Sequence, residues 1–341
     1  MSQTDERTPE RAKEVPGGEA AKPSEIPKRG WLQIVKRGWA EAKVDQVPLL
    51  AAGVAFYAFL ALFPLLIALV LIYGLVVEPA TIANQVGQLT AGLPEDATKI
   101  ITDQLTLAST RETGAGIGVA VSILLALWAA SGGMSNLMTA INTAYDEEEK
   151  RSFVKKRLLA LGLTIGAIVF MIVMLGLIAV FPALANLIDN GVVRFLLQVV
   201  RWVLLAVLVS AALAVLYRVA PDRDAPKMRW VSVGAVAATV LWLLASAGFA
   251  IYVANFGNYA KTYGAIAGIV VMLFWLWITA YAILLGAEVN AESEQQTVKD
   301  TTKGPEAPLG QREAVKADSL PSPEETGSDP KADRQKQEKN R

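Results

Sequence analysis

The sequence of 341 residues contains no histidine and no cysteine. The chain therefore cannot use a histidine general base, a Ser-His-Asp or Cys-His nucleophile, a thiolate or imidazole zinc site, or a disulfide. Charged residues are few, at 19%, and the formal net charge is +0, so the molecule lacks the basic footprint of a nucleic-acid-binding protein. Only carboxylates, hydroxyls, amides, lysines and arginines remain for any chemistry.

Long hydrophobic runs are what the sequence has instead. Hydrophobic residues make up 53% of the chain, a composition that disfavours a soluble enzyme. They gather into six blocks, each about as long as the roughly 20 residues with which an α-helix crosses a bilayer. The blocks predict an all-α polytopic membrane protein with six transmembrane helices, at about residues 49–77, 114–140, 158–181, 199–219, 231–254 and 264–287.

The two ends of the chain differ from this central part. Residues 1–27 and 292–341 are rich in Glu, Lys and Pro and have few large apolar side chains. Such segments cannot bury a core, so we expect two disordered tails around a membrane domain at residues 28–291. The first tail has no apolar stretch of the kind found in cleavable signal peptides.

Two amphipathic patterns lie next to the first span. Within residues 31–42, tryptophans and aliphatic residues recur at helical spacing, which predicts an N-terminal helix in the membrane interface. Between spans one and two, apolar residues recur at helical spacing over 82–93 and again over 97–108. These predict an external helical hairpin, with a loosely ordered loop as the alternative.

The basic residues indicate the topology. Five Lys or Arg residues lie in 28–43, five in 146–157 and four in 218–229, whereas 78–113 has two against five acids. By the positive-inside rule, both termini are expected in the cytoplasm, in agreement with an even number of spans.

The second span turns polar halfway along. Asn136, Thr139 and Thr143 recur at intervals of three and four residues and so share a helical face, just after Gly132 and Gly133. For each residue alone, interhelical hydrogen bonding is the favoured role. A hydrated path or a slot for a lipid headgroup is the alternative for the whole group, because the glycine pair can break the helix and transporters place their sites at broken helices.

Other residues in or near spans have two interpretations. Pro64 interrupts the first span, as a packing kink or as a hinge. Arg194 and Arg201 share a face with Gln198 at the outer end of the fourth span. They either snorkel to the interface, bind an anionic headgroup or substrate, or pair with acids in the first external connection.

Glu288 lies at the end of the last span, where a carboxylate is unfavourable unless it is paired. We expect an ion pair with the basic residues of 150–157; a proton-coupling carboxylate is the alternative. Two glycine pairs, Gly162 with Gly166 and Gly264 with Gly268, have the spacing of helix-packing contacts.

Five segments together resemble the YihY/BrkB family of bacterial inner-membrane proteins. They are DQVPLLAAGVAFYAFLALFPLLIAL, LWAASGGMSNLMTAINTAYDEEEKRSF, VLYRVAPDR, IYVANFGNYAKTYGAIAG and LLGAEVNAE. The resemblance covers roughly residues 31–291, is specific because the segments agree in order, and implies six membrane helices with cytoplasmic ends in the bacterial inner membrane. An older family label, ribonuclease BN, conflicts with the absence of His and of acids suited to two metal ions.

Three functions are compatible with this sequence. The first is a transporter or exporter of a lipid or amphipathic solute, without its own ATPase because no GxxxxGK[ST] loop exists. The second is a non-catalytic membrane scaffold that uses its tails as contacts, and the third is an intramembrane enzyme. We prefer the first function. It implies that the protein is not an enzyme and uses no cofactor, metal or nucleic acid. Membrane lipids are the expected partners, and a homo-oligomer is possible. The candidate path residues are Pro64, Trp128, Gly132, Gly133, Asn136, Asn142, Tyr145, Arg194, Arg201 and Glu288.

Overall fold

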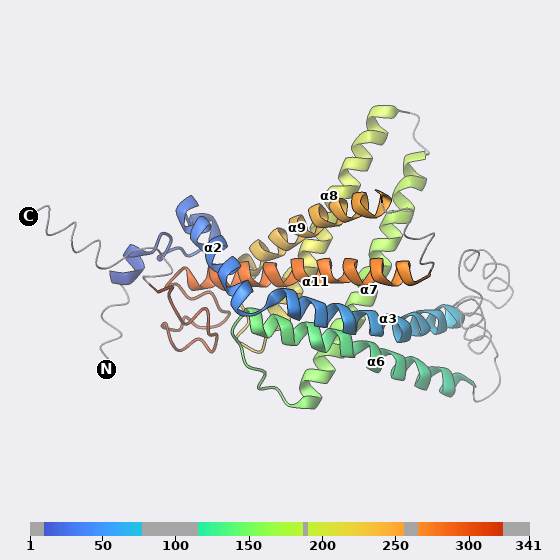
Figure 1. Ribbon diagram of the computed structural model, residues 1–341, viewed down its shortest axis with the longest axis horizontal. Coiled ribbons are helices and arrows are strands. Elements are labelled where there is room, and N and C mark those ends of the chain that lie inside the picture. Colours follow the sequence, from blue (N-terminus) through green and yellow to red (C-terminus); the bar gives the residue numbers. More distant parts are fainter. Residues whose placement is uncertain (1–9, 77–114, 187–189, 256–264, 323–341) are drawn as a thin grey trace, which may run out of the picture. The chain divides into compact units, whose positions relative to one another are not determined.

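A computed structural model describes residues 10–76, 115–186, 190–255 and 265–322 (Figure 1). These residues form helices and connections without a β-strand, which confirms the all-α prediction. The helices are η1 (Pro23–Glu25), α2 (Lys28–Val44), α3 (Val47–Val76), α6 (Ala115–Ala144), α7 (Phe153–Asn186), α8 (Gly191–Val219), α9 (Met228–Asn255) and α11 (Ala265–Gln295).

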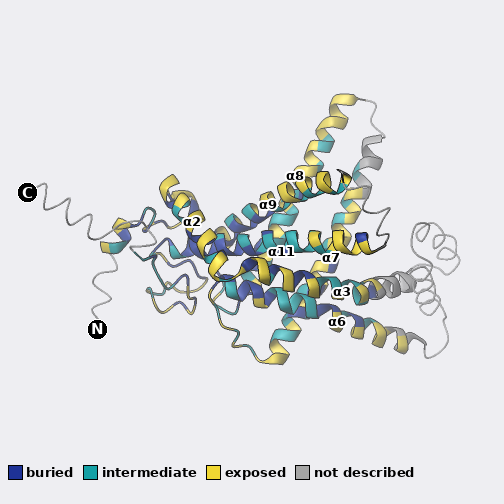
Figure 2. Cartoon of the chain, in the orientation of Figure 1, coloured by how far each residue is buried: buried dark blue, intermediate teal, exposed yellow. Residues whose placement is uncertain are grey.

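Six of these helices are long and apolar enough to cross a membrane, as the sequence predicted. They are α3, α6, α7, α8, α9 and α11, and each contains most or all of one predicted block. They carry many exposed apolar side chains, for example Leu124 and Leu125 on α6 and Leu175 on α7. Figure 2 shows exposed residues along these helices. Side chains of this kind need hydrocarbon rather than water around them.

The chain divides into two compact units. Unit 1 comprises residues up to Val54, the segment Leu137–Arg151 and everything from Phe170 onward. Unit 2 comprises Ala55–Asn136 and Ser152–Val169.

Within unit 1, α9 and α11 pack through two glycines. A Cβ atom at Gly234 would overlap the carbonyl oxygen of Gly286, and a Cβ at Gly286 would lie 2.6 Å from Ala238 Cβ and 2.5 Å from the Tyr217 hydroxyl. This close approach lets Asn290 bridge the helices, with its Oδ1 accepting from Gly234 N at 2.6 Å and its Nδ2 donating to Val231 O at 3.1 Å. Glycine is therefore required at both positions of the crossing.

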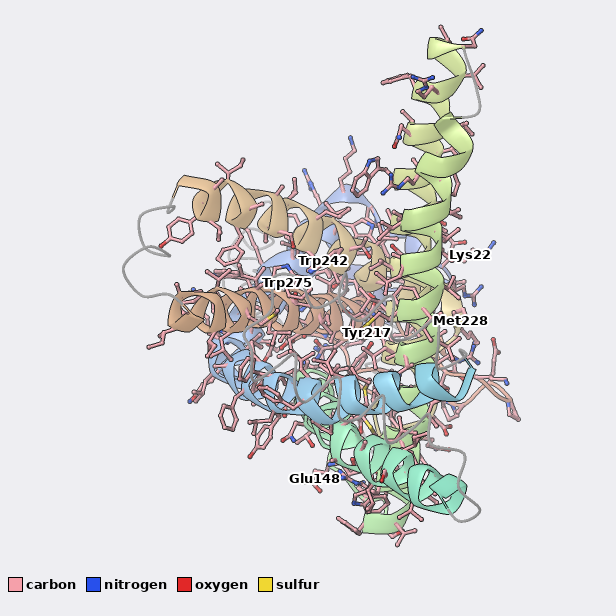
Figure 3. The ribbon with its side chains drawn as sticks, turned by 90° about the vertical axis from the view of Figure 1, so that its right-hand side faces the viewer. Lys22, Glu148, Tyr217, Met228, Trp242 and Trp275 are labelled. Atoms are coloured by element: carbon pink, nitrogen blue, oxygen red, sulfur yellow. The ribbon has the colours of Figure 1, made fainter. Side chains whose placement is uncertain are left out.

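Of the four glycines that the sequence singled out by their spacing, Gly264 lies outside the described residues and the other three do not have this role. A Cβ at Gly162, Gly166 or Gly268 meets no described atom within 4 Å, so the expectation of helix packing at these three residues is wrong. Farther along α9 and α11 the contact is aromatic. Trp242 and Trp275 meet edge to face, with ring centroids 6.4 Å apart (Figure 3).

The helix α2 packs on the C-terminal half of α11, also in unit 1. Ile34, Arg37 and Ala42 on α2 are buried, whereas Val35 and Trp39 are about half exposed. Gly38 makes the approach close, because a Cβ there would lie 3.7 Å from Glu288 Cβ. The predicted N-terminal helix thus exists, and its place in the membrane interface stays a prediction.

In unit 2, α3 and α6 meet at Gly133. A Cβ at this residue would lie 3.1 Å from Ala61 Cβ and 3.2 Å from the carbonyl oxygen of Tyr57. The helix α6 runs without interruption through Gly132 and Gly133, so the expectation that the glycine pair breaks the helix is wrong. Glycine serves here for close packing of two helices rather than for a bend.

The chain after α11 differs from the disordered tail that its composition suggested. Thr297 and Thr301 are buried, and Arg312 donates hydrogen bonds to the carbonyls of Ala307, Lys299, Ala317 and Val298. Residues near the N-terminus join this packing, since Val298 N donates to Gly18 O at 2.8 Å. Many of these contacts are polar and the hydrophobic cluster beside them, Ala20, Ile26, Ile34 and Trp230, is small, which is why composition did not reveal this packing.

Several predicted features lie outside the described residues. They are the external helical hairpin, the acids proposed as partners of Arg194 and Arg201, and the outermost parts of both tails, residues 1–9 and 323–341.

Candidate functional site

A cation, an aromatic ring and an amide come together in unit 2. The guanidinium of Arg157, near the start of α7, lies over the ring of Trp128 on α6, 4.7 Å from its centroid, and donates to Trp128 O at 2.6 Å. Arg157 Nη1 lies 3.7 Å from the Cβ position of Gly132, whose carbonyl accepts from Asn136 Nδ2 at 2.9 Å. We call Trp128, Gly132, Asn136 and Arg157 the arginine site.

The arginine site has unused hydrogen-bonding capacity. The Arg157 Nε atom is inaccessible to solvent and has no hydrogen-bond partner among the described residues. A cation over the face of a tryptophan is stabilised in an apolar setting, and an arginine fork matches a phosphate or carboxylate. The sequence predicted Trp128, Gly132 and Asn136 here and missed Arg157, which it placed in the basic loop.

The polar side chains of α6 bond mainly to their own helix. Ser131 Oγ donates to Trp128 O at 2.7 Å, and Thr143 Oγ1 donates to Thr139 O at 3.3 Å, as Asn136 does to Gly132. One N–H of the Asn136 amide is thus used within α6 rather than on a neighbouring helix.

Pro64 lies inside α3, which continues as a helix to Val76.

Asn142 behaves differently from Asn136. Its Oδ1 accepts from Asp222 N at 2.9 Å and its Nδ2 donates to Glu149 at 3.2 Å, so it ties the end of α6 to the connection after α8. Tyr145 is fully buried beneath the guanidinium of Arg223, 5.2 Å from its ring centroid, and burial raises the pKa of its hydroxyl. Both residues thus connect separate segments of unit 1 through side-chain contacts.

The arginines of α8 show the predicted alignment in part. Arg201 Nη1 reaches Gln198 Oε1 at 3.5 Å and its guanidinium lies 5.5 Å from the Trp202 ring centroid. Arg194 is exposed near the start of the helix. An anionic ligand at this end stays a prediction.

The expected ion pair of Glu288 is wrong. Glu288 is 1% exposed, and neither of its carboxylate oxygens has a hydrogen-bond partner among the described residues. Arg151, one of its expected partners, pairs instead with Glu149 at 2.6 Å and Asp222 at 3.5 Å. What lies against Glu288 is a second acid, Asp45, within reach of a carboxyl-to-carboxylate hydrogen bond.

Glu288 belongs to a larger group, which we call the acidic cluster: Glu41, Asp45, Asp146, Glu288 and Glu292. Two cations enter it. Lys316 Nζ, from the chain after α11, lies 2.8 Å from Glu292, 3.1 Å from Asp146 and 3.7 Å from Glu41. Arg37 donates to Glu292 Oε2 at 2.6 Å and to Gln296 Oε1 at 2.7 Å.

Charge and burial shift the ionisation of this cluster. Burial, followed by the negative charges of Asp146 and Glu41, raises the pKa of Asp45 to about 6. Burial alone would lower the pKa of Lys316, but the carboxylates of Glu292, Asp146 and Glu41 raise it above its ordinary value. The ammonium is therefore charged, while the pKa of Asp45 is raised to about 6.

The sequence missed the acidic cluster apart from Glu288. One signal was present: Glu41, Asp146 and Glu292 stand in or just after the last turns of helices, where a negative charge opposes the helix dipole and requires a cation. Among the residues that the structure describes, no group of three or more acidic side chains is arranged to hold a metal ion.

Comparison with known proteins places the chain in a family. Residues 39–310 match the family described as Virulence factor BrkB. The Putative ribonuclease-like protein YfkH of Bacillus subtilis is 33% identical over 247 residues, which cover 71% of this chain and 88% of YfkH. A UPF0761 membrane protein of Pseudoalteromonas translucida is 25% identical over 84% of this chain and 92% of its own length.

A second UPF0761 membrane protein, from Photobacterium profundum, is 26% identical over 73% of this chain and 77% of its own length. No solved structure matches the chain. Because the family match spans most of the sequence and includes all six predicted spans in full, this multi-pass membrane protein belongs to the Virulence factor BrkB family.

Proposed function

We propose that the protein transports a lipid or amphipathic solute with an anionic headgroup, without an ATPase of its own. The observation that carries this proposal is the arginine site. A cation with an unused donor, a tryptophan and an amide lie within two apolar helices that are long enough to span a membrane. Ionisable groups inside membrane spans are rare and mark substrate or ion pathways.

The surroundings of the arginine site favour an amphipathic ligand. Leu124, Leu125 and Trp128 on α6 are about half exposed or more, and Phe153, Val154 and Leu158 on α7 are exposed as well. An anionic group could pair with Arg157 while its chains lay along these apolar side chains. The same exposed surface gives a fully water-soluble anion no matching contact.

The orientation in this proposal follows from the basic residues. Both termini face the cytoplasm of a bacterial cell, and the start of α7, with Arg157, lies near the inner leaflet. The name ribonuclease-like, borne by YfkH, is not extended to this chain, because the sequence has no histidine for general acid–base catalysis. The proposal is therefore not enzymatic.

The scaffold alternative makes the tails contacts for partners. Parts of both tails pack on the chain itself, through Val298 with Gly18 and Lys316 with Glu292. Partner binding through these parts would require the internal contacts to break. The transport proposal needs no such step.

The test is lipid movement in reconstituted vesicles. The probe is phosphatidylglycerol with a fluorescent label that a membrane-impermeant reductant destroys only in the outer leaflet. The wild-type chain should bring more label outward than protein-free vesicles do, and Arg157→Gln and Asn136→Ala should slow this movement about tenfold, the effect of losing one charge-assisted hydrogen bond. Lys155→Gln, an exposed cation two residues from Arg157, is the matched control and should match wild type.

Two results would contradict the proposal. One is label movement by the wild-type protein that does not exceed that of protein-free vesicles. The other is equal movement by Arg157→Gln and Lys155→Gln. If instead removal of residues after Gln295 abolishes the cellular phenotype while lipid movement is absent throughout, the scaffold function is favoured.

A further inference from the structure

Glu288 is a buried carboxyl group that no described residue of unit 1 compensates by a direct hydrogen bond. It is 1% exposed, both of its oxygens lack a hydrogen-bond donor among the described residues, and α2 covers it closely at Gly38. An isolated ionised carboxylate in such a place costs several kcal/mol or more. The group therefore needs a proton or a bound cation.

The neighbours of Glu288 make this need greater. The charged groups around it come from every element packed there: Arg37 and Glu41 from α2, Asp45 from the connection to α3, Asp146 from the end of α6, Glu292 from α11 and Lys316 from the chain after α11. These are five carboxyl groups, counting Glu288, against two cations. Three helix C-termini meet here as well, and each adds partial negative charge.

The two cations are already engaged. Arg37 pairs with Glu292, and Lys316 pairs with Glu292, Asp146 and Glu41. The two acids left over, Asp45 and Glu288, are the ones that lie against each other. Two carboxyl groups at this separation cannot both ionise without cost, and one proton held between them removes the repulsion and supplies the missing donor.

Backbone geometry brings Asp45 to this position. Asp45 caps the C-terminus of α2, with its N–H donating to Glu41 O at 2.8 Å, and the next residue, Gln46, has a left-handed φ of 52°. A non-glycine residue in this region is uncommon and costs about 1 kcal/mol, which indicates that the turn is held by its surroundings. The turn separates α2 from α3 and leaves the Asp45 carboxyl facing α11.

We propose that Asp45 and Glu288 form a proton-binding pair that shares one proton, and that this proton is the coupling ion of the transport cycle. In the uptake step, one carboxylate of the ionised pair accepts a proton from water and donates it in a hydrogen bond to the other. Release returns the proton to water and leaves two carboxylates. The pair rests on the proposed function only for its coupling role, since proton binding is a property of the cluster itself.

A proton fits the site better than a metal ion. Asp45 and Glu288 supply only two carboxyl groups without a direct ion pair among the described residues, and these residues hold no arrangement of three or more acidic side chains suited to a metal. The Asp45 carboxyl also titrates in the right range, because burial and the neighbouring acids raise its pKa to about 6.

The test is infrared difference spectroscopy of the full-length protein in lipid, titrated from pH 8 to pH 4.5. Wild type should show the carbonyl band of one protonated buried carboxyl group, lost as the pH rises through about 6. The band should be absent at that position in Glu288→Gln and in Asp45→Asn. Glu306→Gln, an exposed acid outside the cluster, is the matched control and should keep the band.

Several outcomes overturn the proton pair. They are a band that persists in both variants, no titrating band in wild type, or a band that sodium ions abolish at constant pH, which would assign the site to a metal cation. If Glu288→Gln does not fold, as judged by helical circular dichroism, Asp45→Asn decides, because its side chain is only partly buried. A titrating band without lipid movement in vesicles would support the proton-binding pair and contradict the transport function. Lipid movement without the band would support transport and contradict the pair.

Discussion

The ion pair between Arg37 and Glu292 allows a prediction about which of its two partners is more costly to remove. Arg37 is 5% exposed and Glu292 is fully buried, with 2.6 Å between Arg37 Nε and Glu292 Oε2. Removing either partner would have a similar cost if the pair stood alone. In the acidic cluster it does not stand alone, because carboxyl groups outnumber cations five to two.

We expect Arg37→Met to be much more destabilising than Glu292→Gln. Without Arg37, only Lys316 compensates the cluster, and loss of one partner of a buried pair costs about 3 to 5 kcal/mol. Glu292→Gln removes one excess negative charge. Its amide oxygen can still accept from Arg37, and Lys316 keeps Asp146 and Glu41, so we expect a cost of about 1 kcal/mol, that of one weakened hydrogen bond.

Thermal unfolding in detergent, followed by tryptophan fluorescence, measures the difference. At roughly 2 °C per kcal/mol, Arg37→Met should lower the midpoint by about 6 °C or more and Glu292→Gln by about 2 °C. Arg29→Met, an exposed arginine on the same helix, is the control and should have little effect. The cost of Arg37→Met should shrink at acidic pH, where carboxylates take up protons. Equal costs for Arg37→Met and Glu292→Gln would refute the reasoning from charge imbalance.

Three further predictions concern packing. Gly286→Ala should destabilise the α9 and α11 crossing by about 3 kcal/mol, as overpacking does, whereas Gly166→Ala, which meets open space, should be neutral in the same thermal assay. Asn142→Leu should cost about 1 to 3 kcal/mol because it leaves Asp222 N without its acceptor, and Asn136→Leu should cost less; equal midpoints for the two variants would remove the distinction drawn between them. Arg312→Met should expose residues 296–322 to protease without changing the six spans, and an unchanged digestion pattern would show that this arginine does not hold the segment.

The six spans could be predicted from sequence because bilayer thickness demands a run of apolar residues, which is visible without any partner. The acidic cluster could not, because its contacts join distant residues: 255 positions separate Arg37 from Glu292. Lys316 was hidden for a second reason. It lies in a polar stretch whose composition resembles disorder, and hydrogen bonds to backbone carbonyls leave no periodic pattern.

The contacts of glycines and asparagines within the helices were equally hard to predict from sequence. Gly234 and Gly286 lack the four-residue partner spacing that drew attention to Gly162 and Gly166, yet they are the ones at a crossing. Asn136 and Asn142 are similar in sequence context, but one bonds to its own helix and the other to Asp222. Which surface a helix buries is decided by its neighbours in space, so residue type alone did not separate the two.

The position of Lys316 in the chain also sets an order of assembly. Synthesis proceeds from the N-terminus, so Arg37, Glu41 and Asp45 are made first and Lys316 is made after all six membrane helices have been synthesised. Of the two cations in the cluster, Arg37 is thus the one that is present early. The ammonium arrives last and closes a set of contacts between the beginning and the end of the chain. A protein truncated before Lys316 would therefore insert its helices normally but lack the ion pairs of this lysine with Glu41, Asp146 and Glu292.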